Sequence, residues 1–236
     1  MIRSWGELRF RLLKSNRLKY RGLVVPIDRD LVPKAVIKQL LRGQYEVPEI
    51  EAALALIRPD DRVLELGTGL GVVSALVAQK LTRGKVLTFD GNPNLQPSIK
   101  ALHRANGITN VTPRHGLVQG GAGAGTATFH LNVNFPEGSI ASARGSTETI
   151  DVPVESWDAV VEAFRPTVLI CDIEGAEVDL LPAVSLDGLR AVVIELHPDV
   201  VPADRLAALK KTLGDGGLVA RDDLASGTVV AYVRQP

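Results

Sequence analysis

The sequence predicts an α/β fold: a doubly wound, mostly parallel seven-stranded sheet, with one antiparallel strand near an edge and a small N-terminal cap. From residue 60 onward, short apolar segments alternate with helix-like segments. Strands that are apolar on both faces and alternate with helices are typical of a parallel sheet covered on both sides. The chain closes with two apolar segments around Ala225-Ser226-Gly227, a turn that predicts a hairpin and therefore the antiparallel strand.

Residues 1–45 are expected to form the cap, and residues 46–236 the main domain. Gly43 is placed to end a cap helix. Pro48 stands near the start of the next helix, where a missing N–H costs little. The elements expected in this region are a helix within 2–12, a strand at 23–26, and helices at 34–41 and 48–57.

The apolar pattern then predicts the elements of the main sheet. The seven strands are expected at 63–66, 86–89, 111–115, 167–170, 191–196, 218–221 and 228–233. The helices are expected at 71–81, 95–105, 177–184 and 203–213. Crossovers between parallel strands should be right-handed.

A β insertion at 120–148 interrupts this alternation. It begins with a glycine-rich run at 120–125 that is too flexible for a helix. Apolar and polar side chains then alternate strictly over 129–135, which predicts a half-buried strand. Because the insertion lies between the third and fourth core strands, it either borders a pocket or forms a surface hairpin.

Composition excludes several classes of protein. Hydrophobic residues make up 45% of the chain and charged residues 23%, which is typical of a folded domain. Cys171 is the single cysteine, so neither a disulfide framework nor a cysteine zinc site is expected. No apolar stretch is long enough for a membrane span, and no secretion signal is visible at the N-terminus. A cytoplasmic location is the expectation.

Charge is balanced overall but uneven along the chain. Basic and acidic residues both total 27, so no global field attracts nucleic acid, and no nucleic-acid partner is expected. Residues 1–21 hold seven basic side chains against Glu7 alone. This arm could contact phosphates, although a solvated arm is the more ordinary interpretation.

The strongest motif runs from residue 63 to 71, where a strand leads into a glycine-rich turn and a helix. Glycines let the backbone approach a ligand closely, and the helix start offers free N–H groups. The spacing of Gly67, Gly69 and Gly71 departs from the G-x-G-x-x-G of dinucleotide sites. Glu65 would repel a pyrophosphate but suits a ligand with ammonium and sulfonium groups. The motif, Thr68 included, therefore predicts a site for S-adenosylmethionine.

Two further strand ends complete the predicted cofactor site. Asp90 ends the second strand, where an acidic side chain accepts hydrogen bonds from ribose hydroxyls. The third strand ends at the same edge, where an adenine could stack. The other residues assigned to the cofactor here are Gly91, Asn92, His115, Gly116 and Leu117.

Acidic side chains gather where the fourth strand ends, at Asp172, Glu174 and Glu177. Ligands of open α/β sheets bind outside the carboxyl ends of the strands. Asp172 is the first candidate for a general base, with Glu174 or His197 as alternatives, whereas Glu177 is expected to be structural. A metal on Asp172 and Glu174 is the less favoured alternative. The sequence shows no completed ligand set, so no metal site is predicted.

These motifs, in this order and spacing, resemble the FkbM family of S-adenosylmethionine-dependent methyltransferases. The resemblance runs from about Gly43 to His197, and its most specific element is the D-x-E-G-x-E stretch at 172–177. It implies a class I methyltransferase fold and O-methylation of a hydroxyl on a sugar, polyketide or other small metabolite. By this likeness Glu65, the three glycines and Asp90 contact the cofactor, and Asp172 and Glu174 lie at the methyl-transfer end. Cys171 departs from the family, whose members often carry lysine there.

Other interpretations stay open at this point. One is a nicotinamide-dependent oxidoreductase on a similar fold, which the glycine spacing and Glu65 oppose. A second is a methyltransferase-like binding module without catalysis. A third is a nucleic-acid or protein methyltransferase, which only the basic arm favours. A homodimer is also compatible with the sequence.

Overall fold

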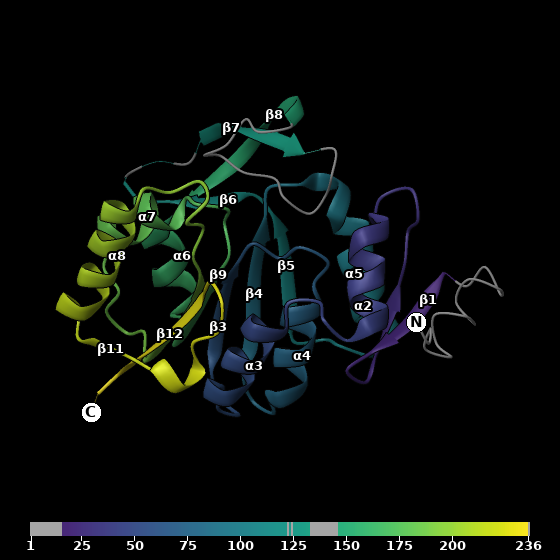
Figure 1. Cartoon of the computed structure of the whole chain (residues 1–236), viewed down its shortest axis with the longest axis horizontal. Coiled ribbons are helices and arrows are strands. Elements are labelled where there is room, and N and C mark those ends of the chain that lie inside the picture. The colour runs from purple at the N-terminus through teal and green to yellow at the C-terminus, as the bar shows by residue number, and fades with distance from the viewer. Residues whose placement is uncertain (1–15, 122, 124, 133–145, 236) are drawn as a thin grey trace.

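The computed structural model describes residues 16–121, 123, 125–132 and 146–235 (Figure 1). A seven-stranded sheet forms the centre, in the order β11-β12-β10-β9-β3-β4-β5. β12 is antiparallel to both of its neighbours, whereas the other pairings are parallel. The predicted sheet and its single antiparallel strand are therefore confirmed. The strands are β3 (Arg62–Leu66), β4 (Lys85–Asp90), β5 (Val111–His115), β9 (Val168–Cys171), β10 (Ala191–Glu195), β11 (Leu218–Ala220) and β12 (Val229–Arg234).

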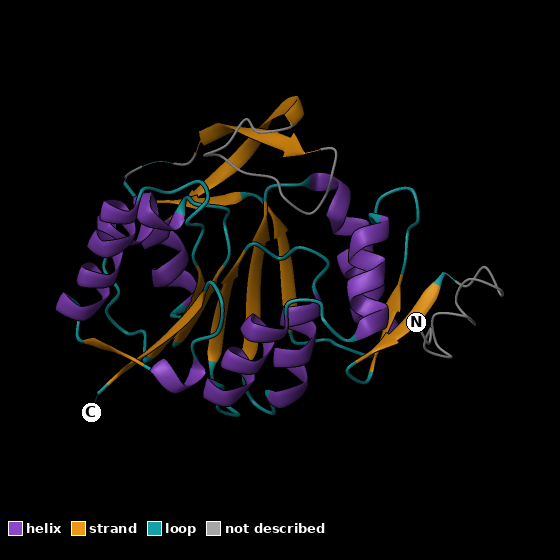
Figure 2. Ribbon diagram, in the orientation of Figure 1, coloured by secondary structure: helices purple, strands orange, loops and turns teal. Residues whose placement is uncertain are grey.

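Helices cover both faces of this sheet (Figure 2). Successive residues of each strand point to opposite faces, so Val63 joins one buried cluster and Leu64 the other. The first cluster receives α3 (Val47–Leu56), α4 (Val72–Lys80) and α5 (Gln96–Ala105). The second receives α6 (Trp157–Phe164), α7 (Glu177–Leu180) and α8 (Ala203–Asp215). Burial on both faces explains why the central strands β9 and β10 are apolar at nearly every position.

Short 3-10 turns adjoin three of these elements. They are η1 (Pro93–Leu95), η2 (Leu181–Ala183) and η3 (Asp222–Leu224). The helix expected at 177–184 is thus one short α-helix followed by η2. Pro182 lacks the N–H that would continue the α-helix at this point. Within the described residues, no helix combines the length and the apolar character that crossing a bilayer requires.

Next to this core lies a hairpin of β1 (Arg17–Tyr20) and β2 (Leu23–Pro26), followed by α2 (Lys34–Arg42). Its buried side chains join the cluster that contains α5. β1 was not predicted, because four residues that alternate between basic and apolar give little signal. The helix expected within 2–12 lies outside the described residues. The domain boundary at residue 45 stays a prediction.

The insertion expected at 120–148 is part of a separate three-stranded sheet above the carboxyl ends of the main strands, which begins at Leu117 and ends at Ser156, beyond both predicted bounds (Figure 1). This sheet consists of β6 (Leu117–Gln119), β7 (Gly125–Asn132) and β8 (Ser146–Ser156), in the order β6-β8-β7. β7 begins at Gly125, earlier than predicted, and residues 133–145 of the expected insertion lie outside the described part of the chain. β8 leads directly into α6, whose first turn is capped by the Ser156 hydroxyl.

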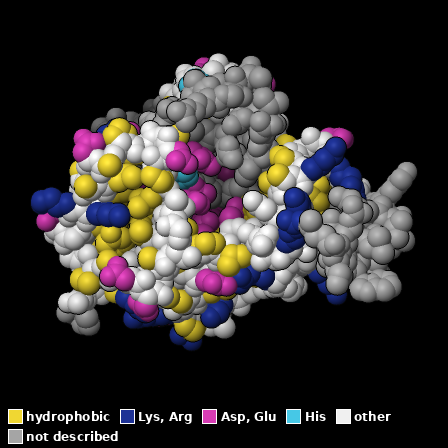
Figure 3. All heavy atoms as spheres, viewed as in Figure 1, with side chains coloured by type: hydrophobic (Ala, Val, Ile, Leu, Met, Phe, Trp, Pro, Cys, Tyr) yellow, Lys and Arg dark blue, Asp and Glu magenta, His cyan; other side chains and the backbone are white. Residues whose placement is uncertain are grey.

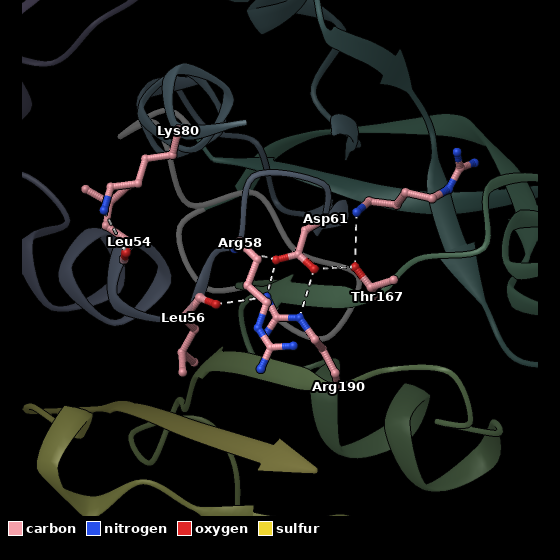
Figure 4. Close-up of polar contacts among 8 residues, drawn as sticks. Leu54, Leu56, Arg58, Asp61, Lys80, Thr167 and Arg190 are labelled. Atoms are coloured by element: carbon pink, nitrogen blue, oxygen red, sulfur yellow. Dashed lines mark hydrogen bonds and ion pairs between the residues drawn. The ribbon is translucent and has the colours of Figure 1, made fainter. Parts of the chain in front are cut away.

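A buried polar network ties the opposite end of the sheet together (Figure 4). The Asp61 carboxylate is 4% exposed and accepts hydrogen bonds from the Arg58 N–H, the Thr167 hydroxyl and the Arg190 guanidinium. Burial would raise the pKa of Asp61, but these hydrogen bonds outweigh it and lower the pKa. Arg190 also donates to the Leu56 carbonyl, so the network joins α3 to the starts of β3, β9 and β10.

We expect Thr167→Val to destabilise the protein by about 2 kcal/mol. The hydroxyl donates to the buried Asp61 carboxylate and accepts from the partly buried Arg62 N–H, and its removal leaves each of these groups one partner short. Urea unfolding would measure the change in free energy. Thr109→Val, at an exposed loop position, is the control and should cost less than about 0.5 kcal/mol. Equal effects of the two substitutions would contradict the assignment.

Candidate active site

A cleft opens at the carboxyl ends of β3, β4 and β9, beneath the small sheet. In Figure 3 this face is hollowed near its centre, where acidic side chains gather around a histidine. The cleft holds about 790 Å³ of empty space, including the part open to solvent. Its walls comprise Glu46, Glu49, Leu66, Gly67, Gly69, Phe89, Asp90, Gly91, Gly116, Leu117, Val118, Phe129, Asp172, Ile173 and Glu174.

Most of the predicted site residues meet in this cleft. Of the predicted cofactor residues, six line it: Gly67, Gly69, Asp90, Gly91, Gly116 and Leu117. The other five lie behind or beside the wall: Glu65, Thr68, Gly71, Asn92 and His115. Asp172 and Glu174 lie on the wall, and His197 stands directly behind them.

The glycine loop is shaped by close approach as well as by backbone conformation. Gly67 has φ +87°, and a Cβ built there would lie 1.7 Å from the carbonyl oxygen of Asp172. The loop therefore touches the chain just beyond β9, where only glycine fits. Gly71 has φ +79° and begins α4 without a side-chain cap, so the first N–H groups of this helix lie beside the loop. The loop thus brings the expected cofactor cradle into contact with the acidic segment.

Asp90 ties this loop to the end of β4. Its carboxylate accepts hydrogen bonds from the Gly69 N–H at 2.9 Å and from the Asn92 N–H at 2.7 Å. Burial raises the pKa of Asp90 to about 6, although both of these hydrogen bonds oppose the rise. Each oxygen keeps a further lone pair, so Asp90 can still accept hydrogen bonds from ribose hydroxyls.

Glu65 lies behind the loop rather than on the cleft wall. It is 1% exposed, and one carboxylate oxygen accepts a hydrogen bond from Thr88, whose hydroxyl also contacts Thr68. The other oxygen is buried without a hydrogen-bond partner in the described structure. Burial raises the pKa of Glu65 to about 8.

The far end of the cleft is apolar. The Phe129 ring, from β7, lies over Gly91 so closely that a Cβ built there would be 2.6 Å from it. Phe89 and Val118 add further apolar surface. The insertion therefore does border the cleft, as one of the two sequence interpretations has it. His115 instead turns its ring nitrogen toward the Gly91 carbonyl, at 3.2 Å.

Three carboxylates surround the His197 ring. Nε2 lies 3.4 Å from oxygens of both Asp172 and Glu174, and Nδ1 lies 3.4 Å from Glu177. Burial would lower the pKa of His197, but hydrogen bonding to Asp172 and Glu177 outweighs it and raises the pKa to about 11. Both ring nitrogens of His197 therefore carry a proton at neutral pH, and the side chain is positively charged. Glu177 also accepts from the Ile173 N–H and is 1% exposed, so it fixes both the turn and the ring.

The turn that follows β9 holds an uncommon backbone conformation. Glu174 has φ +58°, and Gly175 after it has φ +101°. A non-glycine residue in the left-handed region costs about 1–3 kcal/mol and is found most often at functional sites. The conformation turns the acidic segment back toward His197.

Sequence reasoning missed the acidic residues contributed by α3. Glu46 and Glu49 line the cleft, and Glu49 is only 3% exposed. The available signal was the position of Glu49 on the buried face of the helix, beside Ile50 and one turn before Ala53. A charged residue within an apolar stripe is informative, because burial of a carboxylate is costly.

We expect the His197 ring to keep its proton well above pH 8, and nitrogen-resolved NMR would show both ring N–H groups. His103 is the internal control, since burial lowers its pKa to about 4 and it should be neutral at pH 7. The stability contributed by the His197 charge is complete below its unfolded pKa of about 6.5 and is lost as pH rises through about 11. A neutral His197 at pH 8 would contradict this.

Solved structures of known methyltransferases share the fold. Precorrin-6y C5,15-methyltransferase from Geobacter metallireducens GS-15 superimposes with a TM-score of 0.51 at 14% identity, over 92% of this chain and 100% of that one. TYW2 from P. horikoshii, in complex with MeSAdo, superimposes with a TM-score of 0.50 at 12% identity, over 97% of this chain and 79% of that one. These structures share the fold. Ribosomal protein L11 methyltransferase from Thermus thermophilus is 40% identical over 68 residues, 28% of this chain and only 26% of that protein.

The fold is that of class I methyltransferases, which use S-adenosylmethionine as the methyl donor. The family model described as the methyltransferase FkbM domain matches residues 67–209, more than half of the chain. The chain therefore belongs to the FkbM methyltransferase family, as its motifs predict.

Proposed function

We propose that this methyltransferase acts on a hydroxyl oxygen of a small metabolite or sugar, with Asp172 as the general base. One observation carries the proposal. The Asp172 carboxylate lines the cleft, its backbone carbonyl lies against the Gly67 loop, and its Oδ1 atom pairs with His197 Nε2 at 3.4 Å. A cleft-lining carboxylate that a histidine orients beside the glycine loop can accept the proton of an acceptor hydroxyl.

The cofactor would be held by the loop at 67–71, by Asp90, and by the apolar end around Gly91 and Phe129. When bound, S-adenosylmethionine supplies an electrophilic methyl group on a sulfonium. The protein contributes alignment, which can supply about 7–11 kcal/mol of the barrier to a reaction between two bound partners.

The proton of the acceptor hydroxyl passes to the Asp172 carboxylate as the oxygen becomes nucleophilic. His197 is a poor candidate for this role, because its raised pKa leaves it already protonated at neutral pH. Its charge instead holds Asp172 and Glu174 in place, at 3.4 Å from each. Glu174 remains the alternative base. Such a base is worth about 10²–10⁴-fold in rate.

The acidity of the cleft supports a small substrate over a nucleic acid. Glu46, Glu49, Asp90, Asp172 and Glu174 line it, and the lining residues that the structure describes include no lysine or arginine. Phosphate groups would be repelled there. A hydroxyl is uncharged and meets no such barrier.

Methyl-¹³C-labelled cofactor would test the proposal against a panel of sugars, hydroxylated metabolites, amines, RNA and protein. The carbon chemical shift of the product distinguishes methyl on oxygen from methyl on nitrogen or carbon. A new O-methyl signal from a small molecule is the expected result. Label found only on nitrogen, carbon, RNA or protein would overturn the proposal. Tight cofactor binding without transfer to any acceptor would favour a binding module.

A further inference from the structure

Three carboxylates from separate parts of the chain converge beside the cleft, in a second cavity that all three line. Glu49 comes from α3, Asp172 follows β9, and Glu195 ends β10. One oxygen from each lies within 4.8 Å of the others. β9 and β10 are neighbours in the sheet, and α3 packs on β10, so the fold itself brings the three together. No spacing rule in the sequence would have grouped them.

Glu49 is the member that points to a ligand. It is 3% exposed, and its carboxylate has no hydrogen bond or ion pair with any described residue. Glu177 is equally buried but accepts the Ile173 N–H. Burying a carboxylate without a partner is costly, and facing it toward two more carboxylates adds repulsion. A missing positive charge would account for this arrangement.

The donor atoms indicate the kind of cation. All three ligands are carboxylate oxygens, which suit hard cations such as Mg²⁺, Mn²⁺ and Ca²⁺. Opposite ligands about 2.4 Å from a central ion are about 4.8 Å apart, so the measured spread is within reach of such an ion. The Thr228 hydroxyl donates to the Glu195 carboxylate at 2.9 Å and orients it, as supporting hydrogen bonds do at metal sites.

We propose that Glu49, Asp172 and Glu195 bind a divalent cation that prefers oxygen ligands, beside the methyl-transfer end of the cleft. The second cavity opens here between α3 and the turn before β12 and gives the ion a route of entry. The inference does not rest on the identity of the methyl acceptor, because it concerns the protein alone.

Titration of the full chain with Mn²⁺, with free Mn²⁺ followed by electron paramagnetic resonance, tests the site without substrate. We expect one saturable ion per chain, displaced by Mg²⁺. Glu49→Gln and Glu195→Gln should each weaken binding at least tenfold. Glu162→Gln, on the exposed face of α6, is the matched control and should bind as the unmodified protein does.

Circular dichroism separates loss of binding from loss of fold. Should Glu49→Gln fail to fold, the half-buried Glu195 decides the matter through its own variant. Unchanged Mn²⁺ affinity in the folded variants, or no saturable binding, would overturn the proposal. The proposal would also be overturned if butylammonium raised the melting temperature of the protein and Mn²⁺ did not. That result would assign the carboxylates to a cationic substrate instead. None of these results bears on whether methyl is transferred to oxygen.

Discussion

Gly67→Ala is expected to abolish measurable binding of S-adenosylhomocysteine and to destabilise the protein by about 4 kcal/mol or more. Two effects add at this position. Alanine is strained at φ +87°, and its Cβ would lie 1.7 Å from the Asp172 carbonyl oxygen. Because that neighbour is backbone, and the Asp172 N–H donates to the Leu66 carbonyl, relief requires β3 and the segment after β9 to separate. Separation would open the cofactor loop.

Gly22→Ala is the matched control for this prediction. Gly22 has φ +89°, nearly the same conformation, but a Cβ there would meet nothing within 4 Å. Gly22→Ala should lower the free energy of unfolding only by the backbone strain, about 1–2 kcal/mol, and leave cofactor binding unchanged. Calorimetry and urea unfolding of both variants separate the two contributions. Similar losses in the two would show that close approach at Gly67 is unimportant.

Asp172→Asn is expected to lower kcat by about 10²–10⁴-fold while leaving the affinity for S-adenosylhomocysteine within a few-fold of that of the unmodified protein. The substitution keeps the size of the side chain and the backbone contact with Gly67, but the amide cannot accept the proton. The measurement is kcat with the substrate identified by labelling, together with calorimetry for the product cofactor.

Asp215→Asn is the control for Asp172→Asn. This residue is exposed at the end of α8 and pairs with Lys211, the one partner it has among the described residues, so kcat should not change. Retention of full turnover by Asp172→Asn would remove Asp172 from the base role and leave Glu174 as the remaining carboxylate to examine.

Much of the fold could be predicted because buried positions require apolar residues, and these residues recur in the sequence with the period of a strand or a helix. Strands covered on both faces are apolar at nearly every position, as β9 is throughout and β10 is up to its last residue. β8 and α6 were not predicted: the strand alternates with charged residues, and Ser156 alone signals the helix start. β1 is four residues long and carries Arg17 and Lys19 on its exposed side. Short, half-exposed elements leave too few apolar positions to establish a period.

Some residues of the candidate site could be predicted from the sequence and others could not. The segments 67–71 and 172–177 could be predicted, because in each the relevant residues are close together in the sequence. Glu49 and Phe129 could not, since only the folded chain carries them to the cleft. The state of His197 was also beyond the sequence. Its pKa depends on Glu177 and Asp172, which approach the ring only after β9 and β10 pair.

The small sheet of β6, β8 and β7 shares no strand with the main sheet, yet Phe129 reaches from it to the cleft. The small sheet can therefore change in length or sequence without breaking any hydrogen bond between strands of the main sheet. We expect substrate preference to vary among relatives through this small sheet, while the main sheet stays the same.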